Sequence, residues 1–374
     1  MKITIVLGAF LPVPPTMGGA VEKMWYALAQ EFAGRRHEVT IVSRKMPEQP
    51  RDENRDGVRY LRVPGFNTPR SLIWLKVLDL IYSWRVMSIL PPADILVTNT
   101  FWLPLLVRDR TRGKIYVHVG RYPKGQMRFY KRAARLQAPS GAVAGAIQAE
   151  APQLSNKVSI VPYPAPRSTS DTLPSIADRE KIILYVGRVH PEKGVHILID
   201  AFVRGTRAAL ADWKLMIVGP TETKFGGGGN AYLAKLRRSV AEAGERVTFA
   251  GSIFDPAGLE QTFRSARIFV YPSLAERGES FGLAPLEAMT HGCAVFVSSL
   301  DCFGDFIRDG ETGFIFDHRT GDPVASLRER LETVGGEEAL LAQVAEAGRR
   351  KSEEYSVSRV ADRFIADFSS LIQN

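Results

Sequence analysis

The sequence of 374 residues has little cysteine and no long uncharged apolar run, and each absence excludes a class of protein. Only Cys293 and Cys302 are present, which gives neither a disulfide framework nor the ligand spacing of a zinc site. We expect both to be packing residues of a protein in a reducing compartment. The most apolar stretch, residues 71–90, is interrupted by three charged residues, so it predicts a buried amphipathic helix and not a membrane span.

The first residues also lack the pattern of a signal peptide and the glycine pattern of a dinucleotide-binding site. MKITIVLGAF has one lysine and is followed by no cleavage-type site, so we expect no signal peptide and a cytoplasmic protein. The next segment, LPVPPTMGGA, lacks the G-x-G-x-x-G pattern that marks dinucleotide-binding enzymes. The chain also has no internal repeat shorter than a domain, which excludes solenoid and propeller architectures.

The composition is that of a soluble globular protein with two domains. Hydrophobic residues make up 45% and charged residues 24%, and the chain is too long for one ordinary core. The net charge of +9 is uneven, because residues 1–165 hold 24 Lys and Arg against 11 Asp and Glu. The basic first half is therefore where an anionic partner or surface would bind.

Apolar strand patterns alternate with helical patterns throughout, which predicts α/β domains with parallel sheets. A polar, turn-rich segment after Pro164 marks a boundary between two Rossmann-like, doubly wound domains that face a central cleft. We expect residues 1–165 to form an acceptor-binding domain and residues 166–355 a nucleotide-binding domain. The amphipathic helix at residues 356–374 is expected to cross back to the first domain. GAVAGAI, residues 141–147, is expected to be a short strand.

A basic stretch from residue 121 to residue 135 contains no acid. Spacings of three and four predict that most of its cations share one face of a helix. Such a face would meet an anionic acceptor or an anionic membrane surface, although a solvated helix face would look the same. The cations are Arg121, Lys124, Arg128, Lys131, Arg132 and Arg135.

Two carboxylates stand eight residues apart in ESFGLAPLE, from Glu279 to Glu287. The apolar run before them reads as a buried strand, and LAPLEAMTHG reads as a helix that ends before Gly292. Ser280 and Phe281 should open this helix, whose free amide groups can face an anion. An acid near the start of a helix also complements the helix dipole without any ligand.

Two further segments combine glycine with positive charge or with a strand end. In GRVHPEKG, Arg188 and Lys193 bracket a turn at the end of a strand, where they suit a diphosphate. In MGGA, Gly18 and Gly19 allow backbone amides to approach phosphate oxygens closely. A solvated loop and an ordinary tight turn are the alternatives.

Together these segments resemble the retaining glycosyltransferases of family 4, also called group 1, which have the GT-B fold. The resemblance is carried by GGAVEKMWYALA, GRVHPEKGVHILIDAF and RVTFAGSI, and above all by YPSLAERGESFGLAPLEAMTHGCAVFVS with GETGFIF. It covers the second half of the chain strongly and the first half weakly. One departure is VPYPAP, because many family members have Asn and Gly where Tyr163 and Pro164 stand here.

The resemblance implies a role for each matching residue. Arg188 and Lys193 would hold the diphosphate of a nucleotide-sugar donor, and Glu279 would bind hydroxyls of the transferred sugar. Glu287 would bind the ribose hydroxyls, and His118 would lie near the transferred sugar. Backbone groups would come from Gly18, Gly19, Phe281, Gly282 and Leu283.

The implied reaction is transfer of a hexose from a UDP- or GDP-sugar to a glycan, glycolipid or lipid-linked acceptor. No D-x-D run follows a predicted strand, so we expect no essential metal and no cofactor, with Arg188 and Lys193 neutralising the leaving diphosphate. The protein would be cytoplasmic and peripheral on the inner face of the membrane.

Two other functions remain open from the sequence. A relative with the same fold could hydrolyse or epimerise a nucleotide sugar, and this would turn over without an acceptor. A basic domain could also bind a polyanion such as nucleic acid, but no recognition motif or set of stacking aromatics accompanies the charge, and we expect no nucleic-acid partner.

Overall fold

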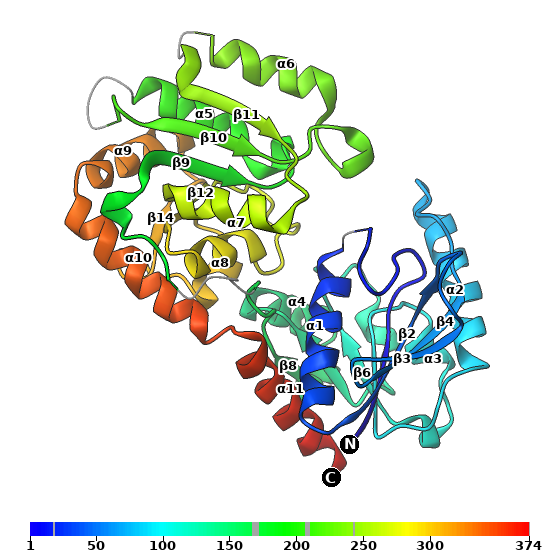
Figure 1. Ribbon diagram of the computed structural model, residues 1–374. Helices are drawn as coiled ribbons and strands as arrows, with labels where there is room; N and C mark the ends of the chain where they lie inside the picture. The colour runs from blue at the N-terminus through cyan, green and yellow to red at the C-terminus, as the bar shows by residue number, and fades with distance from the viewer. Residues whose placement is uncertain (18, 167–171, 206–209, 242–243, 374) are drawn as a thin grey trace. The chain divides into compact units, whose positions relative to one another are not determined.

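The structure is a computed structural model that describes residues 1–17, 19–166, 172–205, 210–241 and 244–373. The chain divides into two compact units, which are coloured by residue number in Figure 1. Unit 1 consists of Met1–Pro164 with Val357–Asn374, and unit 2 consists of Ala165–Ser356.

Unit 1 is built on one sheet with the strand order β3-β4-β2-β1-β5-β6-β7-β8. Its neighbouring strands run parallel, apart from the antiparallel hairpin of β3 and β4. Central strands such as β1 and β5 are continuous apolar runs because helices or loops bury both of their faces. The strands are β1 (Lys2–Val6), β2 (Glu38–Lys45), β3 (Asp52–Arg55), β4 (Val58–Pro64), β5 (Ile95–Thr98), β6 (Lys114–His118), β7 (Arg135–Ala138) and β8 (Val158–Ile160).

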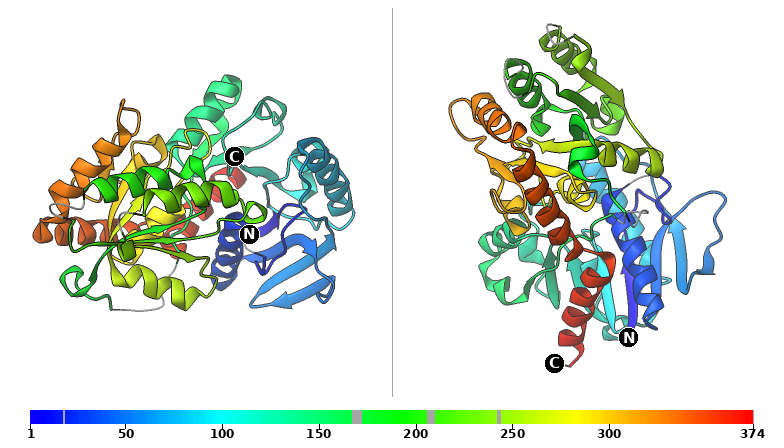
Figure 2. Two further views of the ribbon diagram at one scale, coloured as in Figure 1. Left: turned by 90° about the horizontal axis from the view of Figure 1, so that it is seen from above. Right: turned by 60° about the vertical axis from the view of Figure 1, so that its left-hand side comes forward.

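The last helix of the chain packs along the first helix in unit 1, as Figure 1 and the right-hand view of Figure 2 show. Trp25 contacts Phe364 with ring centroids 5.0 Å apart, and the guanidinium of Arg35 donates to the carbonyl of Ser358 at 2.8 Å. This contact explains why α11 is strongly amphipathic. The helices of unit 1 are α1 (Ala20–Gly34), α2 (Leu72–Met87), α3 (Leu103–Leu106), α4 (Gly141–Glu150) and α11 (Val357–Ile372).

Unit 2 contains a parallel sheet with the order β11-β10-β9-β12-β13-β14. From β9 the chain adds β10 and β11 on one side of the sheet, and from β12 it adds β13 and β14 on the other side. The point at which the strand order reverses therefore lies between β9 and β12, at their carboxyl ends. This is the position at which doubly wound sheets bind ligands. The strands are β9 (Glu180–Val186), β10 (Lys214–Val218), β11 (Val247–Gly251), β12 (Ala266–Tyr271), β13 (Ala294–Ser298) and β14 (Phe314–Phe316). The helices are α5 (Val195–Arg204), α6 (Gly229–Ser239), α7 (Pro256–Ser265), α8 (Leu283–Thr290), α9 (Pro323–Gly335) and α10 (Glu338–Glu353).

Two parallel-sheet, Rossmann-like units confirm the predicted fold class, but one predicted strand is wrong. Residues 141–147 belong to helix α4, which Ser140 caps by accepting the amide of Val143 at 3.2 Å. The strand prediction relied on a short apolar run, and such a run does not distinguish a strand from a buried helix. The capping serine was the signal that decides it.

The helix predicted over residues 121–135 is also absent. Apart from one short 3₁₀ turn at Met127–Phe129, the described chain there is loop until β7 begins at Arg135. Gly125 adopts a φ of 93°, and Pro123 precedes it, so both interrupt helical backbone. The loop instead bonds to Glu150, whose carboxylate accepts the amides of Gly125 and Met127 at 2.6 and 2.7 Å.

Helix α2 occurs where the sequence predicts it, but only one face of it is buried. Asp79, Tyr82, Ser83 and Val86 face the interior of unit 1. The opposite face is exposed, which the expectation of a buried helix did not anticipate.

Candidate functional site

The switch point of unit 2 brings the segment after β9 against the segment after β12. Gly194 makes this approach possible, because it has a φ of 67° and a Cβ there would lie 1.9 Å from the carbonyl oxygen of Pro272. The amide of Leu274 donates to the carbonyl of Glu192 at 2.8 Å and fixes the register of the two loops. Only glycine satisfies both the backbone conformation and the spacing.

This approach places Lys193 against Glu279, although 86 residues separate them in the chain. The ammonium nitrogen of Lys193 lies 2.6 Å from a carboxylate oxygen of Glu279. The hydroxyl of Ser273 donates to the same oxygen at 3.2 Å, and the ring of Tyr271 lies 5.6 Å from the Lys193 nitrogen. Lys193 is only 5% exposed, so the pair is a buried ion pair with additional hydrogen bonding.

Arg188 is opposed by a carboxylate in the same way, but nearer the surface. Its guanidinium lies 2.7 Å from Glu192 and donates to the carbonyl of Gly226 at 2.9 Å. The hydroxyl of Tyr185 donates to the backbone carbonyl of Arg188 at 2.8 Å and holds the loop. A ligand anion that reaches Arg188 therefore has to replace Glu192 or share the guanidinium with it.

Helix α8 begins at Leu283, the first residue of the predicted LAPLEAMTHG helix, whereas Ser280 and Phe281, which were expected to open it, lie in the loop before it. Gly282 precedes it with a φ of 98°, and a Cβ there would lie 2.5 Å from the ring of Phe303. Phe281 is 1% exposed and packs its ring against Phe306 at 5.4 Å, so its side chain belongs to the core of unit 2. Glu287 lies half-buried in the second turn of α8.

In unit 1, Gly19 immediately precedes helix α1, while Gly18 lies outside the described residues. Gly19 has a φ of 95°, and a Cβ there would lie 2.2 Å from a carboxylate oxygen of Glu22. Glu22 is 7% exposed, and this burial raises the pKa of its carboxyl group. The glycine therefore lets the loop close over a buried acid, which no sequence pattern indicated.

His118 ends β6 with its ring buried, at 3% exposure. The amide nitrogen of Gln137 donates to the carbonyl of Val161 at 2.5 Å, so the amide oxygen of Gln137 has to accept from Nδ1 of His118, also at 2.5 Å. Nε2 is then unprotonated and lies 3.3 Å from the hydroxyl of Tyr163. Burial lowers the pKa of His118 to about 4, so the ring is neutral at physiological pH. Tyr163, the departure from the family pattern, thus has a structural partner.

The six basic residues of this stretch, most of which were expected on one helical face, lie at different places in unit 1. The loop that contains them joins the carboxyl end of β6 to the amino end of β7, so it crosses from one edge of the sheet to the other. Arg121 and Lys124 follow β6, and the guanidinium of Arg128 lies 5.0 Å from the ring of Phe129. The guanidinium of Arg135 lies 2.9 Å from the carboxylate of Asp367 on α11 and so serves a contact within unit 1.

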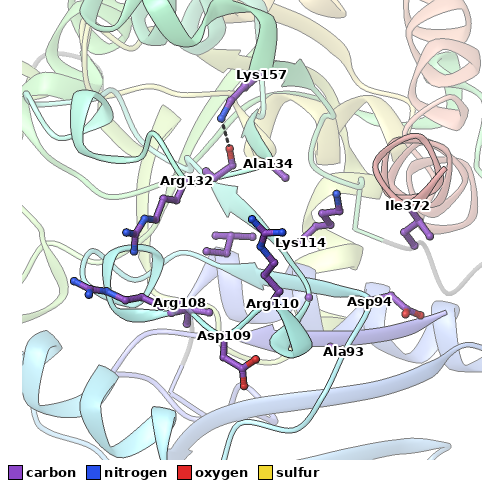
Figure 3. A pocket seen from close by; sticks show the side chains of 14 residues that line it. Ala93, Asp94, Arg108, Asp109, Arg110, Lys114, Arg132, Ala134, Lys157 and Ile372 are labelled. Carbon is purple, nitrogen blue, oxygen red and sulfur yellow. Dashed lines mark hydrogen bonds between the residues drawn. The ribbon is translucent and has the colours of Figure 1, made fainter. Parts of the chain in front are cut away.

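Arg132 lines a pocket of about 840 Å³ at the amino ends of β5, β6 and β7 (Figure 3). The ammonium group of Lys157 donates to the carbonyls of Lys131 and Ala133 at 2.8 and 2.9 Å and closes one side. This edge is opposite the carboxyl ends that hold Arg121 and His118. The other charged residues that line the pocket are Asp94, Arg108, Asp109, Arg110 and Lys114.

Sequence reasoning missed three groups that complete the site in unit 2. Glu192 lies between Arg188 and Lys193 in the chain, and it contacts Arg188 because a 3₁₀ turn folds Pro191–Lys193 back. Ser273 and Tyr271 come from the YPS segment, at the end of the apolar run that the sequence predicts to be a buried strand. Hydroxyl groups at a strand's carboxyl end were the available signal.

Comparison with known proteins identifies the family of both units. Residues 170–351 match the family model described as "Glycosyl transferases group 1", and residues 19–164 match the "Glycosyl transferase 4-like domain". The lipopolysaccharide 1,2-N-acetylglucosaminetransferase of Salmonella typhimurium is 25% identical over 84% of this chain and 84% of its own length. The phosphatidyl-myo-inositol mannosyltransferase of Mycobacterium leprae is 31% identical over 51% of this chain, and the match spans about half of that relative, 47%.

Solved structures agree on the fold. Sucrose-phosphate synthase from Thermosynechococcus elongatus superposes with a TM-score of 0.75 at 19% identity, covering 100% of both chains. HepE from Anabaena, solved in complex with UDP and glucose, has a TM-score of 0.70 at 18% identity, covering 99% of this chain and 100% of its own. Together with the two family models, these matches establish that this chain belongs to the group 1, family 4-like glycosyltransferases and has the GT-B fold.

Proposed function

We propose that the protein transfers a hexose, with retention of anomeric configuration, from a UDP- or GDP-sugar to a glycan, glycolipid or lipid-linked acceptor. The observation that carries this proposal is the contact of Lys193 with Glu279 at the switch point of unit 2. It puts a cation suited to a phosphate directly beside a carboxylate suited to sugar hydroxyls. A nucleotide-diphosphate sugar presents these two chemical groups next to each other.

The donor would replace interactions that the chain now makes with itself. Its diphosphate would bind Arg188 and Lys193, and Glu192 would give up its contact with Arg188. Glu279 would keep the hydroxyl of Ser273 and accept from the hydroxyls of the transferred sugar. The ribose would bind Glu287, and the amides of Gly282 and Leu283 would face the phosphate or the sugar.

The chemistry is the cleavage of the bond between the anomeric carbon and a phosphate oxygen. Negative charge develops on the departing diphosphate, and Arg188 and Lys193 stabilise it from fixed positions in a partly dehydrated site. The acceptor oxygen forms its bond on the same face of the sugar, and its proton passes to the departing phosphate. The cations supply the stabilisation that a metal ion would otherwise give, and the proposal therefore includes no metal and no cofactor.

In unit 1, Gly19 and Gly18 would cover the diphosphate, and His118 would lie near the transferred sugar. Because Nδ1 of His118 is committed to Gln137, Nε2 is the ring atom that would accept from a sugar hydroxyl, in place of Tyr163. Arg121 and Lys124, at the carboxyl edge of the sheet, are the members of the basic loop suited to an anionic acceptor. An anionic acceptor is supported by the names of two relatives, a lipopolysaccharide N-acetylglucosaminetransferase and a phosphatidyl-myo-inositol mannosyltransferase.

Titration of the purified protein with UDP, GDP, ADP and dTDP, by calorimetry and thermal shift, tests the donor site. A diphosphate that binds the native state raises the melting temperature by mass action. We expect UDP or GDP to bind, and Arg188→Ala and Glu287→Ala each to weaken that binding. Binding of none of the four at millimolar concentration would contradict the proposal and leave a polyanion-binding role for the basic unit.

An acceptor-free assay separates transfer from the alternative reactions. Hydrolysis or epimerisation of the donor would turn over at the same rate with and without an acceptor. Transfer requires the rate of nucleotide-diphosphate release to rise with acceptor concentration.

A further inference from the structure

Helix α2 exposes a row of large apolar side chains that the proposed transfer reaction leaves unexplained. Isolated apolar residues are ordinary on protein surfaces, but a contiguous group marks an interaction site. Two of the residues are tryptophans, which rarely lie open to water. The exposed fractions are 75% for Leu72, 75% for Ile73, 60% for Trp74, 38% for Val77, 40% for Ile81 and 71% for Trp84.

These residues form one stripe along the helix. At 3.6 residues per turn, the five from Ile73 to Trp84 fall within an arc of about 100°. Asp79 and Tyr82 lie on the opposite side, in the interior of unit 1. The helix is therefore apolar on two faces, and unit 1 covers only one of them.

The exposed charged residues in α2 and in the two residues before it are all positive. The one acid of α2, Asp79, is 5% exposed, and its carboxylate accepts the amides of Phe101 and Trp102 at 3.0 and 3.2 Å. Lys76, which is exposed, lies on one margin of the stripe. Arg85 lies on the other margin, where it is half-buried and donates to the carbonyl of Pro64 at 2.7 Å. Arg70, just before the helix, is also exposed.

We propose that α2 lies in the headgroup region of a lipid bilayer that contains anionic lipids, with Trp74 and Trp84 inserted. Tryptophan favours this interface, while lysine and arginine extend from its edges to phosphate groups. No helix among the described residues is long and apolar enough to cross a membrane, so α2 lies parallel to the surface. A second copy of the chain fits less well, because a two-fold contact through this face would oppose like charges.

This inference rests on the proposed function for its consequence, which is that the acceptor is anchored in the same bilayer. It also moves the membrane contact from the basic loop of residues 121–135 to the apolar helix. Binding to vesicles needs no sugar donor, however, so the two proposals are tested separately.

The test measures partition of the full chain onto sedimented vesicles of phosphatidylcholine with phosphatidylglycerol, and onto phosphatidylcholine alone. We expect binding to both, stronger on the anionic vesicles, and a loss of at least about tenfold in Trp74→Ala/Trp84→Ala. Phe225→Ala/Phe254→Ala is the matched control, because it removes two aromatics that are 50% and 80% exposed in unit 2. This control should bind as the wild type does. Lys76→Gln should lose about fivefold on anionic vesicles only.

Three results would overturn the inference. The first is absence of the wild type from the vesicle pellet, and the second is binding of the tryptophan double variant as tight as that of the wild type. The third is a wild-type dimer, detected by sedimentation velocity, that only the tryptophan double variant disrupts. If the protein binds a diphosphate but not vesicles, the membrane inference is wrong and the proposed transfer function is unaffected. If it binds vesicles but no diphosphate, only the proposed transfer function is wrong.

Discussion

The buried pair of Lys193 and Glu279 gives the most direct test of how the site is held together. Lys193→Met removes the charge but keeps most of the apolar length of the side chain. Glu279→Gln keeps the shape and an oxygen that can accept from Lys193 and Ser273. Both variants, and the double variant, keep the volume of the site nearly unchanged.

The two single substitutions should differ in cost. Lys193→Met leaves a carboxylate of low exposure without its cation and held only by hydroxyl groups, including those of Ser273 and Tyr271, so we expect a loss of about 3 kcal/mol in the free energy of unfolding. Glu279→Gln leaves a cation beside a neutral amide oxygen and the face of Tyr271, so a loss of about 1–2 kcal/mol is expected. The double variant should cost about 1–2 kcal/mol less than the sum of the two.

Urea unfolding at pH 7 followed by circular dichroism measures these costs, and hydrogen exchange of peptides from residues 266–290 assigns them to unit 2. The reasoning fails if Lys193→Met costs less than about 1 kcal/mol. It also fails if the double variant equals the sum of the single variants within about 0.5 kcal/mol, because the two side chains would then not be coupled.

Three further substitutions test separate parts of the argument. Glu192→Gln removes an exposed competitor for Arg188, so UDP or GDP should bind up to about fivefold tighter by calorimetry, and weaker binding would contradict this role. Gly194→Ala should cost more than about 2 kcal/mol in unfolding and abolish diphosphate binding, whereas the control Gly310→Ala, with a φ of 73° and no neighbour within 4 Å of its Cβ, should cost about 1 kcal/mol. Because the pKa of His118 falls to about 4, below its unfolded value, its contribution to stability is present above about pH 6.5 and is lost as the pH falls towards 4. In His118→Gln, the melting temperature should therefore depend less on pH between about 4 and 6.5 than it does in the wild type. An unchanged slope would contradict the conclusion that the ring of His118 is buried and neutral.

The alternation of strands and helices was predictable because the buried strands of a parallel sheet are continuous apolar runs. The two wrong predictions, a strand at residues 141–147 and a helix at residues 121–135, concern short runs whose side-chain pattern does not distinguish helix from strand or loop. Ser140 decides that residues 141–150 are helical, and Pro123 with Gly125 decides that the basic stretch is not. In both places the turn chemistry outweighed the side-chain pattern.

The side-chain contacts of the site were less predictable, because they depend on which loops meet. Arg188, Lys193 and Glu279 could be recognised as charged groups at strand ends. Their partners could not, since the contact of Lys193 with Glu279 requires the carbonyl oxygen of Pro272 to lie where a Cβ of residue 194 would stand. A glycine pattern indicates that two backbones approach, but it does not say which backbone approaches.

The pairing of both cations with carboxylates suits the diphosphate site proposed above for Arg188 and Lys193. A cation as buried as Lys193 is costly to desolvate without a nearby anion, and the loop carrying it would then be unstable. Glu279 supplies that anion from the segment that would also bind the sugar. The contact of Lys193 with Glu279 therefore also fixes the distance between the cation proposed to bind phosphate and the acid proposed to bind the sugar. Arg188 is more exposed and needs a weaker partner, so a bound diphosphate would displace Glu192 from it at little cost.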